Sequence, residues 1–211
     1  MLNLHVVLAV DRAGLVGEDG ETHHGIYDVG FLRQAPGLRI LAPASRQELD
    51  KMLTWAVQEQ KGPVAIRYPR GGDGAYTDAQ WSADQSVIIH KRGMDGAIVT
   101  YGTLVNNALN AANILAEQGI DISVIRLAEL SSVSFQELAN YLDGISNAVF
   151  AEEASAGIYD AVASALRDKC RFVRVDLGDD YVPHGSVEQL YKNYGLDAES
   201  LAQKMKEVLG K

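Results

Sequence analysis

The sequence predicts an α/β protein whose sheets are mainly parallel. Short apolar runs rich in β-branched residues alternate with segments of helical period along most of the chain. Many of the helical segments open at a capping residue and stop at a glycine. With 211 residues, 47% of them hydrophobic, the chain can bury the core of one large domain or two small ones.

The first predicted strand is the apolar run of residues 5–10, read as a buried parallel strand that ends at Asp11. The loop that follows, Asp11 to Asp28, holds four glycines and is too polar for a core. In open α/β sheets ligands gather where loops leave the carboxyl ends of strands. This loop is therefore the first candidate for a functional site.

The next residues predict a short helix, two strands and a longer helix. Ser45 and Glu48 have the spacing of a capping box, in which each side chain accepts from the other residue's backbone N–H. Apolar residues follow at a spacing of three and four, so a helix is predicted up to about Gly62. The other elements are a helix at 29–34 and strands at 38–42 and 63–67.

Residues 71–85 are polar, glycine-rich and without a period, which indicates a linker between two domains. We expect a first domain at 1–75, a linker at 76–85 and a second domain at 86–211. The second domain alternates strands at 87–89, 97–100, 120–125, 148–151 and 172–175 with helices at 108–117, 135–142 and 158–169, and two short helices opened by Ser186 and Asp197 close it.

The first domain offers only about three strands, against a usual sheet of about five or six. We therefore expect the chain to begin inside a domain whose earlier strands lie upstream.

Composition limits the classes of partner. The formal charge of −9 and the pI near 5.0 oppose binding to a phosphate backbone, so no nucleic-acid partner is expected. The single cysteine, Cys170, forms no disulfide framework, and no apolar run approaches the ~20 residues that span a bilayer. We expect a soluble, cytoplasmic protein without a membrane partner.

Arg12 and Arg70 follow the ends of two predicted strands, in two glycine-containing loops that could face one another. Two guanidinium groups above glycine backbone suit a phosphate or a carboxylate. The alternative is a structural salt bridge from Arg12 to a nearby acid such as Asp11 or Asp19.

Asp19 and His23 lie four residues apart in the same loop, where an aspartate can orient an imidazole for hydrogen bonding or proton transfer. Ordinary loop capping by Asp19 is the alternative. The pair of His23 and His24 also suggests a metal, but adjacent side chains diverge and no second ligand cluster follows.

Glu152 and Glu153 follow a predicted strand and have the composition of a paired-carboxylate site. Consecutive residues on an extended chain point to opposite faces, so at least one is expected to be solvated or structural, and their role stays open. Tyr181 and His184 lie in a turn and are expected to pack at an interface.

Six motifs resemble the transketolase family of thiamine-diphosphate enzymes, and within it the 1-deoxy-D-xylulose-5-phosphate synthase branch. The resemblance covers essentially the whole chain, and its first and third motifs are specific to that branch. The motifs are Asp11-Arg-Ala-Gly-Leu-Val-Gly-Glu-Asp-Gly-Glu-Thr-His-His-Gly25, Leu38-Arg-Ile-Leu-Ala-Pro-Ala-Ser45, Gly62-Pro-Val-Ala-Ile-Arg-Tyr-Pro-Arg-Gly71, Tyr101-Gly-Thr103, Glu152-Glu153 and Val182-Pro-His-Gly185.

The resemblance implies a transferase that condenses pyruvate with D-glyceraldehyde 3-phosphate, with loss of carbon dioxide, in the supply of isoprenoid precursors and thiamine. By it, residues 1–75 are the C-terminal part of a pyrimidine-binding domain and residues 86–211 are a transketolase C-terminal domain. Arg12 and Arg70 match arginines that hold the phosphate of the aldehyde. Asp19 and His23 match catalytic polar residues, with His23 acting by hydrogen bonding or proton transfer at the developing hydroxyl.

The resemblance also implies a homodimer, with thiamine diphosphate and Mg²⁺ as cofactors. In the family, the Gly-Asp-Gly motif for Mg²⁺ and the diphosphate, and the glutamate that activates the aminopyrimidine, lie upstream of the part present here. No cofactor-binding or metal-binding residue is therefore assigned. We expect a C-terminal fragment, inactive alone, that supplies the acceptor-phosphate site and dimer contacts.

Two departures from the family pattern concern packing or dimer contacts. Residues 128–132 replace a Lys-Pro-Leu-Asp pattern, and residues 155–157 shorten a glycine-rich turn. Two alternatives remain: a non-catalytic dimerisation subunit, and another family enzyme such as a transketolase or a dehydrogenase E1 β-subunit, which the first and third motifs disfavour.

Overall fold

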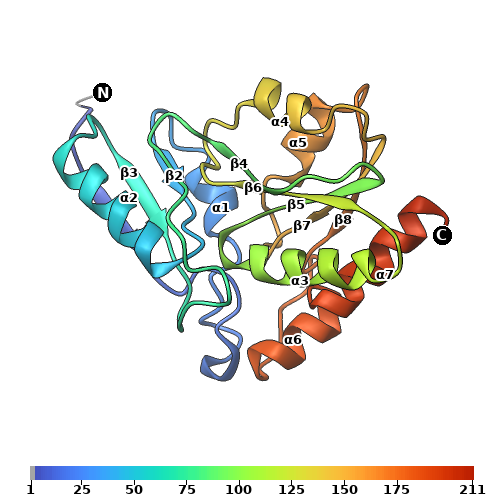
Figure 1. The fold of residues 1–211 in the computed structure, drawn as a ribbon. Coiled ribbons are helices and arrows are strands. Elements are labelled where there is room, and N and C mark those ends of the chain that lie inside the picture. Colours follow the sequence, from blue (N-terminus) through green and yellow to red (C-terminus); the bar gives the residue numbers. More distant parts are fainter. Residues whose placement is uncertain (1–2) are drawn as a thin grey trace.

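The computed structural model describes residues 3–211 and contains two sheets, each covered by helices on both faces (Figure 1). The first sheet is parallel, in the order β1-β3-β2. Helix α2 packs on one face of it and helix α1 on the other. Its elements are β1 (Val7–Val10), η1 (Gly17–Asp19), α1 (Asp28–Leu32), β2 (Arg39–Leu41), α2 (Arg46–Gln58) and β3 (Val64–Arg67).

The second sheet has the order β4-β6-β5-β7-β8, and only β4 runs antiparallel to its neighbour. Helices α3, α6 and α7 pack against one face and α4 and α5 against the other (Figure 1). The α/β fold with mainly parallel sheets is confirmed. The elements are β4 (Val87–Lys91), β5 (Gly96–Tyr101), η2 (Gly102–Leu104), α3 (Val105–Ala116), β6 (Ile122–Leu127), α4 (Phe135–Tyr141), β7 (Asn147–Ala151), α5 (Tyr159–Ala165), β8 (Arg171–Val175), α6 (Val187–Tyr194) and α7 (Ala198–Leu209).

Local sequence signals account for several helix ends. Ser186 caps α6 in a complete capping box with Gln189, and Ser134 caps α4. Gly195 and Gly210 end α6 and α7 in the left-handed conformation that glycine adopts without strain.

Within the described residues strand β1 differs from the prediction, because it pairs on one side only and is partly buried. It pairs with β3 on one side, and Leu8 keeps 41% of its surface exposed. Residues 5–10 predicted a buried strand because an apolar, β-branched run has the same composition at an edge as in the middle of a sheet. Only its position in the strand order distinguishes the two.

The predicted capping box of Ser45 and Glu48 is only half formed. Ser45 does accept from the Glu48 backbone N–H, at 3.1 Å, but the Glu48 carboxylate does not return the bond to Ser45. It is fully buried and accepts from Ala44 N at 2.8 Å and from Arg126 Nη2 at 2.6 Å. A buried guanidinium outweighs one backbone N–H as a partner, so this carboxylate joins α2 to β6.

The segment from residue 76 to residue 85 forms no helix or strand, and it is anchored by two buried aromatic side chains, Tyr76 and Trp81. Its Trp81 is 1% exposed, and the Trp81 backbone N–H donates to Glu48 Oε1 at 3.3 Å. Backbone hydrogen bonds also connect the two sheets directly, from Ala42 N to Ala128 O at 2.9 Å and from Leu130 N to Ile40 O at 2.8 Å. We call residues 76–85 the strap, because they hold the two sheet units together.

His90 gives the stability of this junction a pH dependence. It accepts from Arg126 Nε at 3.0 Å, and burial followed by the charge of Arg126 lowers the pKa of His90 from 6.5 to about 4. Between these values the unfolded chain binds a proton that the folded chain refuses, so the free energy of unfolding should fall as the pH is lowered from 6.5 towards 4. Urea unfolding across this range measures the slope, and His90→Gln, whose amide oxygen can still accept from Arg126, should flatten it. An equal slope in this variant would remove His90 as the cause.

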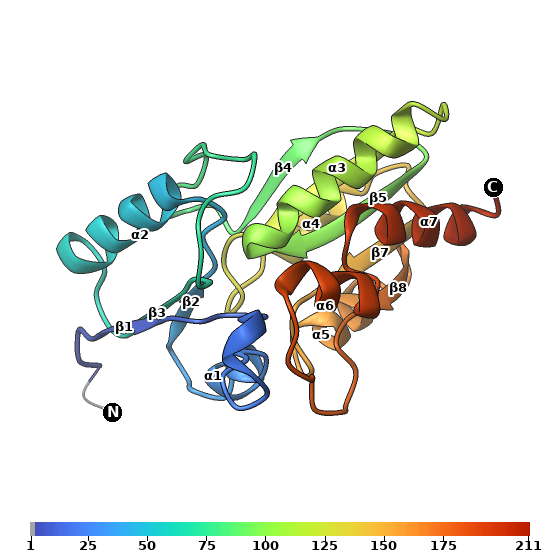
Figure 2. The same ribbon diagram turned by 90° about the horizontal axis from the view of Figure 1, so that it is seen from below.

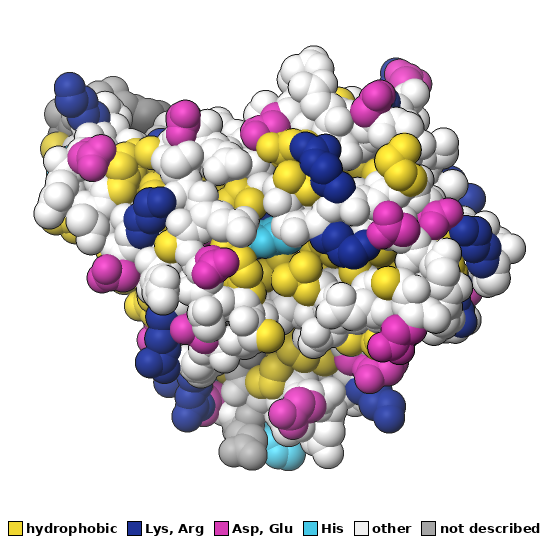
Figure 3. Space-filling view, in the orientation of Figure 1, with side chains coloured by type: hydrophobic (Ala, Val, Ile, Leu, Met, Phe, Trp, Pro, Cys, Tyr) yellow, Lys and Arg dark blue, Asp and Glu magenta, His cyan; other side chains and the backbone are white. Residues whose placement is uncertain are grey.

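On the face drawn in Figure 3, acidic and basic side chains are interspersed over most of the surface, and several basic side chains gather at its lower left. Among residues 3–211, none of the helices has the length and apolar character needed to cross a membrane.

Candidate functional site

The loop between β1 and α1 lies beside α6, where the first unit meets the end of the second (Figure 2). Backbone hydrogen bonds fix its course: Ala13 N donates to Tyr68 O at 3.0 Å, and Gly14 and Gly25 exchange bonds of 2.8 and 2.9 Å. A side chain at Gly25 would overlap the carbonyl of Arg12. Arg12 itself has φ of 57°, a left-handed conformation that the surrounding contacts must maintain.

Arg12 and Arg70 converge on one carboxylate, that of Asp19. Arg12 Nε donates to Asp19 Oδ2 at 3.2 Å, while Arg70 Nη1 donates to Asp19 Oδ1. A second acid, Asp11, lies 3.8 Å from Arg12 Nη1. The hydrogen bond from Arg70, supported by Arg12, holds the pKa of Asp19 below its usual range. Two loops from separate strand ends therefore share one anion.

Arg12 and Arg70 keep N–H groups that Asp19 does not occupy and that a larger anion could use. Each guanidinium carries five N–H groups, and the side chains of Arg12 and Arg70 are 45% and 56% exposed. Arg70 borders a cavity of about 430 Å³ that Glu153 also lines, and another of about 300 Å³ beside Gly17 and Ser186. A small anion can thus reach Arg70 through these cavities and Arg12 from its exposed side, and a phosphate offers more acceptor oxygens than the carboxylate now held.

The predicted pairing of Asp19 with His23 is not formed. His23 is exposed, and its Nδ1 lies 3.1 Å from Thr22 Oγ1, while Asp19 faces the arginines. Charged guanidinium donors are stronger partners for a carboxylate than a neutral imidazole. Asp19 and His23 thus lie in the same loop, four residues apart, but do not contact each other.

His24 diverges from His23, as predicted. It is buried, accepts from Val16 N through Nδ1 at 3.1 Å, and its Nε2 lies 3.4 Å from Pro183 O. Burial lowers the pKa of His24, which favours the neutral ring. Within residues 3–211 no three His, Cys, Asp or Glu side chains lie together in a way that could hold a metal ion.

Glu152 and Glu153 are both buried, so neither is the solvated carboxylate that the sequence allowed. Glu152 is structural: it accepts from Ile158 N at 2.9 Å and from the Tyr101 hydroxyl at 3.2 Å. Glu153 turns the other way and accepts from Leu15 N in the candidate loop at 3.4 Å. Sequence reasoning missed this contact because 138 positions separate its partners.

The turn at Tyr181 and His184 meets the candidate loop through its backbone. Both side chains are exposed in this chain, and Tyr181 keeps 81% of its surface. The contact is made instead by the carbonyl of Pro183, which faces His24.

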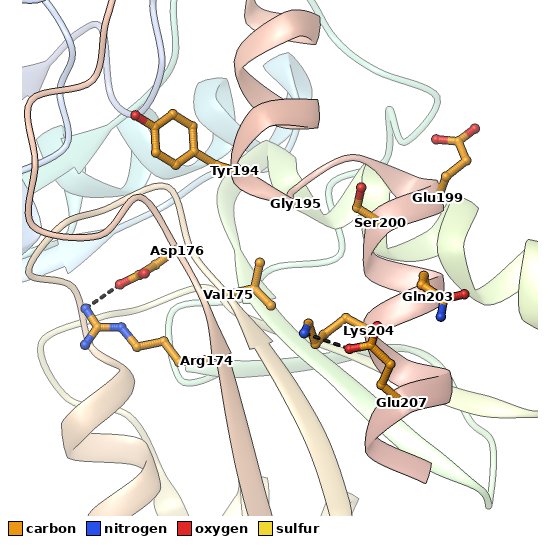
Figure 4. Close-up of a pocket in the computed structure, with 10 residues that line it drawn as sticks. All are labelled: Arg174, Val175, Asp176, Tyr194, Gly195, Glu199, Ser200, Gln203, Lys204 and Glu207. Carbon is orange, nitrogen blue, oxygen red and sulfur yellow. Dashed lines mark hydrogen bonds and ion pairs between the residues drawn. The ribbon is translucent and has the colours of Figure 1, made fainter. Parts of the chain in front are cut away.

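A separate cavity of about 560 Å³ lies between the end of β8 and the turn from α6 to α7 (Figure 4). Its two cationic side chains are already paired, Arg174 with Asp176 and Lys204 with Glu207 at 2.8 Å. It contains none of the residues that the sequence singled out, and we assign it no role.

Comparison with known families matches nearly all of the chain. The transketolase pyrimidine binding domain matches residues 2–72, and the transketolase C-terminal domain matches residues 85–201. Two similar proteins are the 1-deoxy-D-xylulose-5-phosphate synthases of Chlorobium phaeovibrioides, with 39% identity, and Chlorobaculum tepidum, with 40% identity. Each alignment covers 97% of this chain, but only 33% of the first relative and 34% of the second. The chain thus spans about a third of the curated relatives it matches.

A solved structure described as a split gene transketolase in an inactive β4 tetramer has the same fold. It superimposes with a TM-score of 0.86 at 27% identity, covering 97% of this chain and 67% of that chain. The likeness extends through both sheet units.

Proposed function

The chain belongs to the transketolase family, and on that premise we propose that it is the part of a thiamine-diphosphate-dependent 1-deoxy-D-xylulose-5-phosphate synthase that binds the aldehyde's phosphate. The proposed reaction joins pyruvate to D-glyceraldehyde 3-phosphate with loss of carbon dioxide, towards isoprenoid precursors and thiamine. Residues 1–75 would belong to the pyrimidine-binding domain and 86–211 to the C-terminal domain. The observation that carries the proposal is the convergence of Arg12 and Arg70 on Asp19.

A phosphate would replace Asp19 as the shared anion of the two arginines. The phosphate dianion carries more charge than a carboxylate and has three free oxygens, so each guanidinium can pair with its own oxygen. Hydrogen bonds to charged groups contribute about 1.5 to 3 kcal/mol each. Asp19, once displaced, would lie near His23 in the same loop and beside the reacting end of the aldehyde.

His23 is the proposed proton-handling residue. Its exposed ring touches only the Thr22 hydroxyl among the interactions described, so it is available to a substrate hydroxyl. His23→Ala in the assembled enzyme should lower turnover by about 10²-fold, the lower end of what a positioned acid or base contributes. Phosphate affinity should stay the same, because the arginines are untouched. The matched control is Thr22→Val, which removes the His23 partner but keeps the ring, and unchanged turnover in His23→Ala would end this assignment.

Among residues 3–211 no three His, Cys, Asp or Glu side chains lie together in a way that could hold a metal ion, and the family resemblance puts the motif for Mg²⁺ and the diphosphate upstream. We therefore assign the thiamine-diphosphate site to a part of the enzyme outside these residues, and derive no step through the cofactor. The chain spans about a third of its curated relatives, which leaves ample room for that part elsewhere. By this proposal the chain alone is inactive, and the active form is a homodimer.

The proposal is tested by titrating the chain with D-glyceraldehyde 3-phosphate and with D-glyceraldehyde in a calorimeter. The phosphorylated aldehyde should bind at least about tenfold more tightly, because only it engages the two arginines. Equal affinity for the two aldehydes would overturn the phosphate assignment. Titration with pyruvate, which lacks a phosphate, is a further comparison.

A second candidate is a subunit that supports assembly without taking part in catalysis. It is favoured by the likeness to a structure described as an inactive β4 tetramer of a split gene transketolase. Such a subunit should self-associate in light scattering yet show no preference for the phosphorylated aldehyde. The two candidates therefore separate in the same titration.

A further inference from the structure

Glu153 is the one acidic side chain of the second unit that the described contacts join to the candidate loop. It lies two residues after the end of β7, and its Oε1 accepts from Leu15 N at 3.4 Å. Leu15 lies three residues after Arg12, so the bond acts on the short backbone stretch that sets the course of that arginine.

The fit between Glu153 and the loop is close. A Cβ built on Gly14 would lie only 2.8 Å from Glu153 Oε2, so the carboxyl group occupies room that a larger residue would take. Gly14 has φ of 78°, which favours glycine at this position independently. The Glu153 side chain is thus packed against the backbone of Gly14 and bonded to that of Leu15.

Three charged or titratable groups from other elements surround this carboxyl group. The Tyr191 hydroxyl of α6 interacts with it, and the ion pair of Arg67 with Asp28 lies nearby. Burial raises the pKa of Glu153, and Tyr191 and Arg67 oppose that rise. Tyr191 is partly buried, and the desolvation of its hydroxyl raises its pKa well above the usual value, so it remains a hydrogen-bond donor.

The cavity of about 430 Å³ connects this carboxyl group with Arg70. Glu153 therefore touches the loop of one arginine and faces the cavity that the other arginine borders. It does not contact either guanidinium among the hydrogen bonds and ion pairs of the described residues.

We propose that Glu153 is a positioning residue for the phosphate site, which fixes the backbone at Gly14 and Leu15 and thereby the direction of Arg12. The inference rests on the proposed function, because it assigns Glu153 to the same anion site. Through Glu153 the C-terminal unit contributes to substrate affinity without touching the substrate.

The test compares three variants of the whole chain for affinity towards inorganic phosphate. Glu153→Ala removes the acceptor of Leu15 N and should weaken phosphate binding about fivefold to tenfold, the effect of one hydrogen bond. Glu153→Gln keeps an acceptor oxygen and should stay within about threefold of the parent chain. The exposed Glu188, which borders the same cavity, supplies the control Glu188→Ala, and its phosphate affinity should not fall.

Whether phosphate affinity falls or rises in Glu153→Ala distinguishes a positioning role of Glu153 from a purely electrostatic one. If Glu153 acted only through its charge, its removal in Glu153→Ala would tighten phosphate binding, which would overturn the proposal. Amide hydrogen exchange supplies a second measurement: protection at Leu15 should be lost in Glu153→Ala and kept in Glu153→Gln. Unchanged protection in a folded Glu153→Ala chain would also overturn it.

The same measurements distinguish failure of the proposed function from failure of this inference. If the parent chain shows no preference for the phosphorylated aldehyde, the proposed function fails, and exchange at Leu15 still decides whether Glu153 holds the loop. If the parent chain binds phosphate and Glu153→Ala binds it equally well, only the positioning role fails.

Discussion

Glu48→Ala is expected to lower the free energy of unfolding by about 3–5 kcal/mol, the usual cost of leaving one partner of a buried ion pair alone. Glu48 and Arg126 are both fully buried and lie 2.6 Å apart. Without the carboxylate, the described partners of the Arg126 guanidinium are neutral: the carbonyl of Ala42 and the rings of His90 and Tyr76. Urea unfolding at pH 7, followed by tryptophan fluorescence and by far-UV circular dichroism, measures the loss.

A double-mutant cycle with Arg126→Met separates the ion pair from its surroundings. Arg126→Met leaves the Glu48 carboxylate buried without its charged partner, so it should also be strongly destabilising. The double variant should lose less than the sum of the single losses, with a coupling of at least about 1 kcal/mol. Leu53→Ala, a truncation on the same helix away from the pair, is the control. Additive losses would show that the pair does not contribute as a unit.

The double variant Arg12→Ala with Arg70→Ala is expected to lose about 10²- to 10⁴-fold in affinity for D-glyceraldehyde 3-phosphate, as two charge-assisted pairings of about 1.5 to 3 kcal/mol are removed. Each single variant should lose about 10- to 100-fold. The stability should change little, because both side chains are about half exposed and surface ion pairs contribute about 0 to 1 kcal/mol. Calorimetric titration of the parent and variant chains provides the comparison.

The control for this loss is Arg171→Ala, which removes an exposed arginine at the amino end of β8. It changes the net charge by the same amount as either single variant, so it corrects for long-range electrostatics. If Arg171→Ala weakens binding as much as Arg70→Ala, the affinity reflects overall charge and the convergence on Asp19 has no special role. Affinity for unphosphorylated D-glyceraldehyde should be the same in all of these chains.

Local signals in the sequence were sufficient to predict most helices and strands and the α/β fold class. Period, caps and glycine stops predicted the helices of the second unit, because these features act within one or two turns. The features that the sequence did not predict are contacts between segments far apart in the chain. The edge position of β1, the buried packing of Trp81 and the ion pair of Glu48 with Arg126 all depend on which distant segments meet.

The candidate site was predictable in its residues but not in its contacts. Arg12, Asp19, His23 and Arg70 were singled out from strand ends, glycine loops and a family resemblance, and their roles remain predictions. Nothing local indicates that Asp19 lies between the two arginines, since Arg70 arrives from a loop 51 positions away. Spacing suggested a bond from Asp19 to His23, but in the fold the stronger charged donors take the carboxylate.

The buried pairing of Glu48 with Arg126 also bears on how such chains can be recombined. A chimera joined within the strap takes Glu48 from one parent and Arg126 from the other. If one parent lacks its member of the pair, the hybrid encloses a lone charge and loses much of a typical domain's stability of about 5–15 kcal/mol. Between relatives that share both residues, a crossover at this point should keep the pair intact. The apparent domain boundary is a poor crossover point for all others.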